Sequence, residues 1–335
     1  MKYFSKNFLF YLVCYLFSLM FVNITFGNNN TITEEQLTFE ITQNWKQLKE
    51  EYEKGLDMMV ASDYSAGSHK VSRQFRICFD KNNELNHFLS YHGVPWESLF
   101  AINSKYAFHL RKATVSSSWT ITRMFDNPDY ARTDHQFYNK LLPNTSIIFD
   151  GMMVEQGWFE ELLKSDEFEI LVLKNIEDGE DGVITELKFQ SNYQVDEVHK
   201  ILEGTITFIP NLFWLIKKYD FKIEAVPQNK SEKSEYANVK HQIDYHIIEG
   251  IPLPKRIEMI YYSLNNGETI SHEIQELVSV KRGKIPDDIV FLRYYGFSES
   301  SDPVRMGNVV RIILMVAGVL LIIIGFYLRY RASKM

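Results

Sequence analysis

Cysteine is nearly absent from this 335-residue sequence, which contains only Cys14 and Cys78. Cys14 falls in an N-terminal apolar run that is expected to be removed, which would leave Cys78 alone. An internal disulfide is then impossible, so the fold must be held by packing. Because nothing in the sequence provides Cys78 with a base or a lowered pKa, we interpret its thiol as structural and not as a nucleophile.

Motifs of catalysis and cofactor binding are also missing. There is no Gly-x-Ser-x-Gly elbow, no dinucleotide-binding glycine pattern and no phosphate-binding loop. His87 and His92 are five residues apart, and His241 and His246 fall on opposite faces of one expected strand, so neither pair has the spacing of metal ligands. The acidic stretch 177–188 has glycine and lysine where an EF-hand needs oxygen ligands. We therefore expect neither an enzyme nor a metal or cofactor site.

Clusters of basic residues are lacking between the two ends of the chain. The formal net charge is −7, yet residues 1–27 carry two positive charges, residues 304–335 carry five, and neither end has an acidic residue. Residues 28–303 therefore carry a net charge of −14. An acidic surface repels phosphate backbones, so nucleic acid is excluded as a partner.

The N-terminus has the pattern of a targeting segment. Lys2 and Lys6 precede a long apolar run, and small residues occupy the first and third places of Thr25-Phe26-Gly27. This pattern predicts a signal peptide over residues 1–27 that is cleaved after export, and the alternative is an uncleaved anchor helix.

The C-terminus has the pattern of a membrane span. Ile312–Leu328 are 17 residues without a charge. A segment that starts at Val309 has 20 residues, including Arg311, and is long enough to cross about 30 Å of hydrocarbon. Basic residues in the tail 329–335 favour a cytoplasmic tail. We therefore predict a single-pass protein of the cytoplasmic (inner) membrane, with a domain at 28–296 outside the cytoplasm, a linker at 297–308 and a transmembrane helix at 309–328.

The domain begins with one amphipathic helix. Thr33 and Gln36 have the spacing of a capping box, and apolar residues then recur three or four positions apart. They are Leu37, Ile41, Trp45, Leu48, Tyr52, Leu56 and Met59. The pattern predicts a helix over Leu37–Met59 whose apolar stripe needs a partner surface.

From Ser62 onward, apolar residues alternate as in strands. The strands that we expect are near Val71–Phe79, Phe100–Ile102, Tyr106–Arg111, Trp119–Arg123, Ser146–Asp150, Glu169–Lys174, Val183–Gln190, Val239–Ile247, Lys255–Tyr262, Ile270–Val280 and Ile289–Tyr295. Short turns separate most of them, which favours an antiparallel meander with one helical turn at Gly157–Leu163.

Residues 204–225 contain an unusual pair of expected strands, Thr205–Ile209 and Leu212–Ala225. In the second strand, one row of side chains is apolar except for Lys217. The other row should meet water, but it begins with Leu212, Trp214 and Ile216 before it becomes charged. Half of the second face is therefore apolar and needs a cover.

Five phrases of the sequence, in order, resemble a known group of proteins. They are the capped N-terminal helix, "FAINSKYAFHLRK" with "SSSWTI", "WFEELLKSDEFEI", "GTITFIPNLFWLIKKYDFKI" and "IPDDIVFLRYYGFSE". Over most of residues 31–330 this order is similar to that of membrane-anchored exported bacterial proteins related to the periplasmic lipoprotein-carrier (LolA/LolB-like) superfamily. The resemblance implies an antiparallel sheet curled into an incomplete barrel, with helices on its concave face and an apolar cavity between them.

We therefore predict an α+β fold: a large curled antiparallel sheet with a helix on its concave face, followed by one transmembrane helix. The predicted function is non-enzymatic binding of a lipid, an acylated protein or another hydrophobic ligand between sheet and helix. The expected lining residues are Trp214, Leu212, Ile216, Phe208, Trp45 and Leu48. The alternative is an anchored protein–protein interaction module with a closed core, whose acidic surface meets another protein of the cell envelope.

Overall fold

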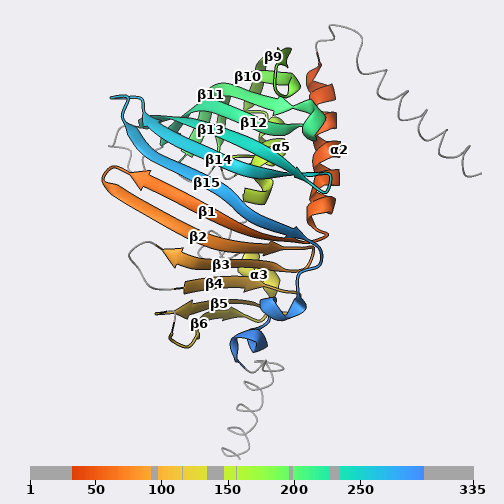
Figure 1. Ribbon diagram of the computed structural model, residues 1–335. Helices are drawn as coiled ribbons and strands as arrows, with labels where there is room; N and C mark the ends of the chain where they lie inside the picture. Colours follow the sequence, from red (N-terminus) through yellow and green to blue (C-terminus); the bar gives the residue numbers. More distant parts are fainter. Residues whose placement is uncertain are drawn as a thin grey trace, which may run out of the picture.

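A single large antiparallel sheet dominates the structure (Figure 1). The computed structural model describes residues 32–91, 97–114, 116–133, 147–155, 157–195, 199–225 and 234–297. The 13 strands of the sheet follow the order β6-β5-β4-β3-β2-β1-β15-β14-β13-β12-β11-β10-β9, so that β6 and β9 form opposite edges and the sheet does not close. An open, mostly antiparallel sheet with few helices agrees with the predicted α+β fold class.

The segments predicted as signal peptide (1–27), transmembrane helix (309–328) and cytoplasmic tail (329–335) lie outside the described residues, as does all but the first residue of the linker. Among the helices inside the described ranges, none combines the length and the apolar character of a membrane span.

The sheet consists of two meanders. The first comprises β1 (Leu56–Ala66), β2 (His69–Phe79), β3 (Glu84–Tyr91), β4 (Glu97–Ile102), β5 (Ala107–Lys112) and β6 (Thr120–Phe125). The second comprises β9 (Phe168–Asp178), β10 (Gly182–Gln194), β11 (His199–Ile209), β12 (Leu215–Ala225), β13 (Glu235–Ile248), β14 (Ile251–Ser263) and β15 (Thr269–Arg282). They join where β1 pairs with β15. β7 (Met153–Val154) and β8 (Gly157–Trp158) form a separate small hairpin.

The remaining described elements are short, apart from α2 (Glu34–Tyr52). They are α3 (Pro128–Thr133) and α5 (Phe159–Leu163), with four 3₁₀ helices: η1 (Asp150–Met152), η2 (Pro210–Leu212), η3 (Asp287–Val290) and η4 (Leu292–Tyr295). α5 confirms the helical turn predicted at Gly157–Leu163.

The predicted N-terminal helix is confirmed at its start and wrong at its end. The capping box forms, because Thr33 Oγ1 accepts from the backbone of Gln36 and the Gln36 side chain accepts from the backbone of Thr33. The helix ends at Tyr52, whereas the sequence predicted Met59. Leu56 and Met59 belong to β1 instead, and helical and alternating spacing cannot be told apart over so few residues.

Gly55 explains the early end of the helix. Its φ of +119° is a conformation that other residues rarely adopt, and a Cβ there would lie 2.1 Å from the backbone oxygen of Gly283. The chain therefore turns sharply at Gly55 and enters the sheet beside the end of β15.

Two predicted strands are wrong. Ile147–Phe149 are helical and continue into η1, which replaces the strand predicted at Ser146–Asp150, and η3 and η4 replace most of the strand predicted at Ile289–Tyr295. Both are short apolar runs that become buried, and such runs do not reveal their periodicity.

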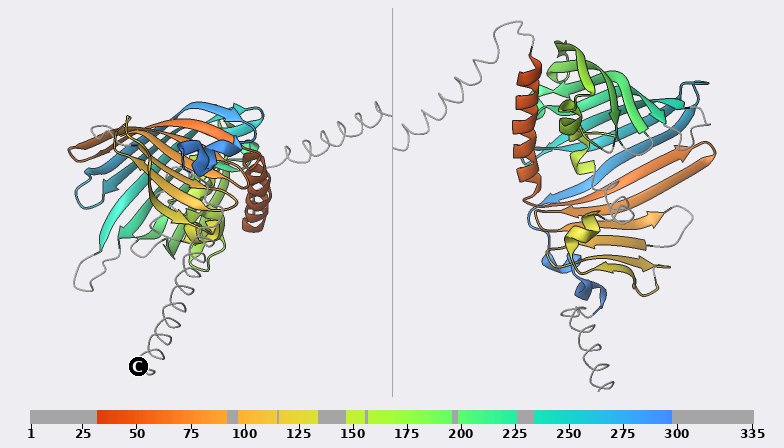
Figure 2. Two further views of the ribbon diagram at one scale, coloured as in Figure 1. Left: turned by 90° about the horizontal axis from the view of Figure 1, so that it is seen from below. Right: turned by 180° about the vertical axis from the view of Figure 1, so that it is seen from behind.

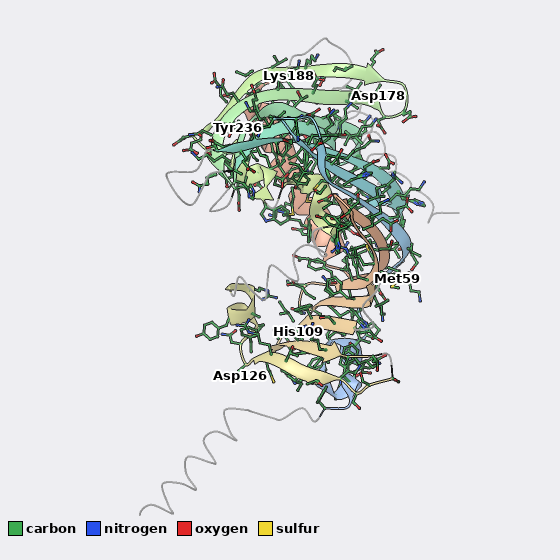
Figure 3. All side chains as sticks on the ribbon, turned by 90° about the vertical axis from the view of Figure 1, so that its left-hand side faces the viewer. Met59, His109, Asp126, Asp178, Lys188 and Tyr236 are labelled. Carbon is green, nitrogen blue, oxygen red and sulfur yellow. The ribbon has the colours of Figure 1, made fainter. Side chains whose placement is uncertain are left out.

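The two halves of the sheet are covered differently, and β3–β6 have an apolar cluster with α3 on one face and another with residues 285–297 on the other face. Seen along the sheet in Figure 3, the half between Asp178 and Met59 curls into an arch. Its concave face, called the inner face below, packs on α2 and on the inner segment (residues 147–155 and 157–163). On β2–β6 a second apolar cluster lies on the other face, where residues 285–297 cover it. Figure 2 shows α2 running across one end of the strands.

Candidate functional site

A β-bulge explains why Ile216 is buried although it alternates with the other apolar row of β12. Thr207 pairs with Lys218 and Phe208 pairs with Ile216, so Lys217 is an extra residue in β12. A bulge shifts the alternation of the strand by one residue, which places Ile216 on the same inner face as Tyr219. The displaced Lys217 forms ion pairs with Asp178 and Asp181.

The predicted strand Leu212–Ala225 begins later than expected, at Leu215. Leu212 ends η2, and Phe213 and Trp214 both have a φ of +57°. A left-handed conformation costs a non-glycine residue roughly 1–2 kcal/mol. Two consecutive aromatic residues in this conformation make the 213–214 turn a strained point of the backbone.

The structure brings the six predicted lining residues together around this turn. Trp45, Leu48, Phe208 and Ile216 are fully buried, Trp214 is 9% exposed and Leu212 is partly buried. The Trp45 Nε1–H group donates to the Trp214 carbonyl oxygen over 3.2 Å. α2 therefore covers the apolar side chains that the sequence left without a partner.

Among the described residues, these six side chains pack against other apolar side chains of the core. All six belong to one apolar core or pack against it. An open depression of about 430 Å³ lies between β1–β3, β15 and η3–η4, and one of about 910 Å³ lies on the outer face of β10–β14. None of the six lines either depression. That they line a cavity therefore stays a prediction.

A row of rings crosses the inner face from α2 to β13. Consecutive ring centroids lie 4.5–6.5 Å apart. We call it the aromatic row, and it consists of Trp45, Phe159, Phe168, Phe189, Phe221, Tyr219 and His241. Phe208 joins it through Phe159 at 5.3 Å. The predicted lining residues are thus one end of a longer apolar track.

Gly204 makes the middle of the aromatic row possible. It pairs with Phe189 on one side and with Phe221 on the other. A Cβ at Gly204 would lie 2.2 Å from the Cβ of Phe221 and 2.6 Å from the backbone oxygen of Asp220. The missing side chain lets the two phenylalanine rings approach each other across β11.

A buried polar group lies at the β13 end of the row. His241, with Nε2 2.8 Å from Asp150 Oδ2, is 2% exposed and stacks on Tyr219. The contact between His241 and Asp150 does not meet hydrogen-bond geometry, and neither ring nitrogen has a hydrogen-bond partner among the described residues.

Glu155 completes this polar group. Its Oε2 accepts a hydrogen bond of 2.8 Å from the Tyr261 hydroxyl, and its Oε1 is buried with no hydrogen-bond partner within the described ranges. Its backbone is left-handed, with a φ of +54°. Burial raises the pKa of the Glu155 carboxyl, which favours its protonated form. The same cause raises the pKa values of Tyr219 and Tyr261.

The stability of the protein should depend on pH through Glu155. Because its folded-state pKa lies above the unfolded value, the free energy of unfolding is greatest below the unfolded pKa and falls as the pH rises through the folded pKa. The fall is about 1.4 kcal/mol for each unit between the two pKa values. Glu155→Gln should remove this slope in urea denaturations of the full chain at a series of pH values.

Four other ionisable groups act on Glu155 in this titration: Tyr261, His241 and His199 favour the ionised form, and Asp150 opposes it. The matched control is Glu258→Gln on the outer face, whose carboxyl pKa is lowered, mainly by a hydrogen bond from His272. An unchanged slope in the Glu155→Gln variant would contradict the assignment.

Sequence reasoning found the apolar end of this site and missed the polar end. His241 was considered only as a metal ligand, and Glu155 and Asp150 were not singled out. One signal was present: His241 lies on the apolar row of its strand, between Val239 and Ile243. For Glu155 we find no sequence signal, because the fold of the inner segment places it.

Cys78 is fully buried, with Sγ 3.4 Å from Asp57 Oδ1. Burial first, and then the neighbouring Asp57 carboxylate, raise the pKa of the thiol. A thiol with a raised pKa is a poor nucleophile, as a structural role requires.

The fold defines an α+β protein with an open, curled antiparallel sheet around an apolar core. No protein-family profile matches the sequence, and no curated protein matches it.

Solved structures with a similar fold include a LolA superfamily protein from Nitrosomonas europaea, with 12% identity, 76% of this chain and 98% of that chain covered, and a TM-score of 0.38. Another is a DUF1329 family protein from Desulfovibrio piger, with 10% identity, 80% and 100% coverage and a TM-score of 0.40. A third is a putative outer membrane lipoprotein-sorting protein domain from Vibrio parahaemolyticus, with 7% identity, 79% and 100% coverage and a TM-score of 0.42. These likenesses include the superfamily that the order of sequence elements resembles, and at such low scores they carry no argument about function.

Proposed function

We propose that residues 28–296 form a non-enzymatic domain that binds a lipid, an acylated protein or another hydrophobic ligand on the inner face. The domain is held at the extracytoplasmic side of the cytoplasmic membrane by the helix at 309–328. The single observation that carries the proposal is the strained turn at Phe213 and Trp214, directly where α2 closes the apolar core. Backbone strain of this kind is concentrated at ligand clamps and switch regions.

α2 is attached in a way that an acyl chain can replace. Among its buried side chains in the described structure, Trp45 hydrogen-bonds to the 213–214 turn and Tyr52 to β14, and the other three make apolar contacts. Burial of one such side chain is worth about 1.5–3 kcal/mol and burial of one methylene about 0.8 kcal/mol. A chain of a dozen carbons, at about 10 kcal/mol, therefore matches four or five side chains of α2. Release of the strained turn would further favour the exchange.

Quenching by brominated acyl chains tests the proposal. A dibrominated fatty acid added to the full-length chain in lipid nanodiscs should quench tryptophan fluorescence at the inner face. The triple variant Trp45→Phe/Trp158→Phe/Trp214→Phe should lose most of this quenching, because the described tryptophans that pack on the inner-face core are gone.

The matched control is Trp119→Phe, since Trp119 lies on the opposite face, 5.6 Å from Tyr295 between ring centroids. This variant should keep the quenching of the unmodified chain. Equal quenching in all three proteins, or none, would contradict binding at the inner face.

The alternative, an anchored interaction module with a closed core, is favoured by one observation. The predicted lining residues are packed against each other, while the 910 Å³ depression on the outer face is lined by charged side chains such as Lys218, Asp220 and Lys240. Absence of quenching, together with crosslinks from this outer face to one envelope protein, would support the alternative.

A further inference from the structure

The polar group at the end of the aromatic row stands out within an apolar interior. Glu155 Oε1 and both ring nitrogens of His241 are buried and have no hydrogen-bond partner among the described residues. Nε2 of His241 contacts the Asp150 carboxyl at 2.8 Å, which leaves Glu155 Oε1 and His241 Nδ1 without a partner in the described structure; a buried polar atom without a partner costs about 1–3 kcal/mol, so two such atoms in one place require a reason. They come from two different elements, the inner segment and β13, which the fold brings together.

The chemistry of these atoms defines what they can bind. A protonated Glu155 carboxyl has an O–H group to donate from Oε1, because Oε2 already accepts from Tyr261. Because Nε2 of His241 faces the Asp150 carboxyl, Nδ1 is the ring nitrogen left to meet a ligand, and in a neutral imidazole it accepts the hydrogen bond that a ligand hydroxyl donates. Together they match a group that both accepts and donates one hydrogen bond, such as an alcohol.

Charge argues against an ionised head group. An anionic carboxylate or phosphate would be brought into a buried site beside the Asp150 carboxyl, where burial would disfavour its charge as it disfavours that of Glu155. Like charges in a low-dielectric interior repel strongly. A cationic head group would lose its hydration shell on burial and would need a carboxylate partner in return. Neither carboxyl group is available, because that of Asp150 already contacts His241 and that of Glu155 is favoured in its neutral form.

The aromatic row connects this polar group to the predicted lining residues. It runs without interruption from Trp45 to His241, with ring centroids no more than 6.5 Å apart. A ligand with its apolar chain along the row would therefore present its head to His241 and Glu155.

We propose that Glu155 and His241 bind the head of the ligand, and that this head is an uncharged hydroxyl-bearing group, as in a monoacylglycerol. The inference rests on the proposed function and specifies it: the ligand is a neutral lipid, with its head at β13 and β14 and its chain end at α2.

Photoreactive lipids test this assignment. Three probes share one chain length and carry an alkyne and a terminal diazirine: a monoacylglycerol, a fatty acid and an alkylamine. They are added to membranes that contain the full-length chain and are irradiated, and the labelled peptides are mapped by mass spectrometry. The monoacylglycerol should label five- to tenfold more strongly than the two charged probes, the effect expected of one or two hydrogen bonds. Its crosslinks should lie in α2 and β11, because the diazirine is at the chain end.

Variants separate head recognition from a structural role. Glu155→Gln should keep the preference for the neutral probe, since its amide still donates a hydrogen bond. Glu155→Leu should abolish the preference while the fatty acid still labels. His241→Phe keeps a ring beside Tyr219 and removes both nitrogens, so it should also abolish the preference, and it serves if Glu155→Leu fails to fold. The matched control is His272→Gln on the outer face, where His272 Nε2 lies 2.9 Å from Glu258 Oε1.

The outcomes distinguish the two proposals. Equal labelling of the inner face by all three probes, unaffected by the Glu155 and His241 variants, would overturn the head-group assignment and leave the proposed function standing. Preference for the fatty acid or for the alkylamine would also overturn the assignment. Absence of labelling at the inner face with every probe would overturn both.

Discussion

Trp45→Ala is expected to lower the free energy of unfolding by about 3–5 kcal/mol, the range for removal of a large buried aromatic side chain. Trp45 is fully buried, packs on Phe159 and donates a hydrogen bond to Trp214. The substitution removes the contact that holds α2 on the strained turn. The measurement is urea denaturation of the full chain in detergent micelles, followed by circular dichroism.

The matched control lies on the same helix. Phe39 is 63% exposed, so Phe39→Ala removes an aromatic side chain from α2 without opening the core and should change the stability by no more than about 0.5 kcal/mol. Similar losses in both variants would show that helix formation, and not the contact with the sheet, determines the stability.

Gly204→Ala is expected to destabilise the protein by about 3 kcal/mol or more, the upper end of the range for overpacking. The new methyl group would meet the backbone oxygen of Asp220 at 2.6 Å and the Cα of Phe221 at 2.7 Å. Backbone atoms of a central strand cannot rotate away as a side chain does, so β11 and β12 would have to separate. Thermal denaturation of the full chain measures the loss.

Gly179→Ala is the control for this substitution. Gly179 lies in the turn between β9 and β10, and a Cβ there meets nothing within 4 Å. Its alanine variant should melt within a few degrees of the unmodified protein. A Gly204→Ala variant that melts with it would mean that the strands separate at little cost, and that the aromatic row does not depend on their close approach.

The sequence predicted most strands because long alternating runs mark a half-buried sheet. The predictions of helices and strands were wrong where the apolar run was short, or where its spacing fitted a helix and a strand equally well. Leu56 and Met59 fitted the helical stripe as well as the strand, and the apolar run at 289–295 had no readable period. β3 was missed because Glu84 and Asn86 place polar side chains on the row that a core strand would fill with apolar ones.

For the candidate site, the sequence predicted which apolar residues lie at the α2 end, but it did not predict their backbone conformation or strand register. Alternation placed Ile216 on the wrong row, because a bulge at Lys217 depends on pairing with β11 and leaves no mark in β12 alone, and it placed Trp214 in a strand that begins only at Leu215. The polar end depends on the meeting of residues about 90 positions apart, Asp150 and His241, which only the folded sheet brings into contact.

The pairing of β1 with β15 has a consequence for how the chain folds. It links Leu56 to Arg282 and Ser65 to His272, so the first strand of the domain waits for the last one to be synthesised. Each meander can assemble from neighbouring hairpins, whereas closure of a loop of more than 200 residues comes at a high entropic cost and is slow. Until then, β1 and β15 have open hydrogen-bonding edges that invite aggregation. A newly made chain is therefore prone to aggregation until β1 pairs with β15 and joins the two meanders.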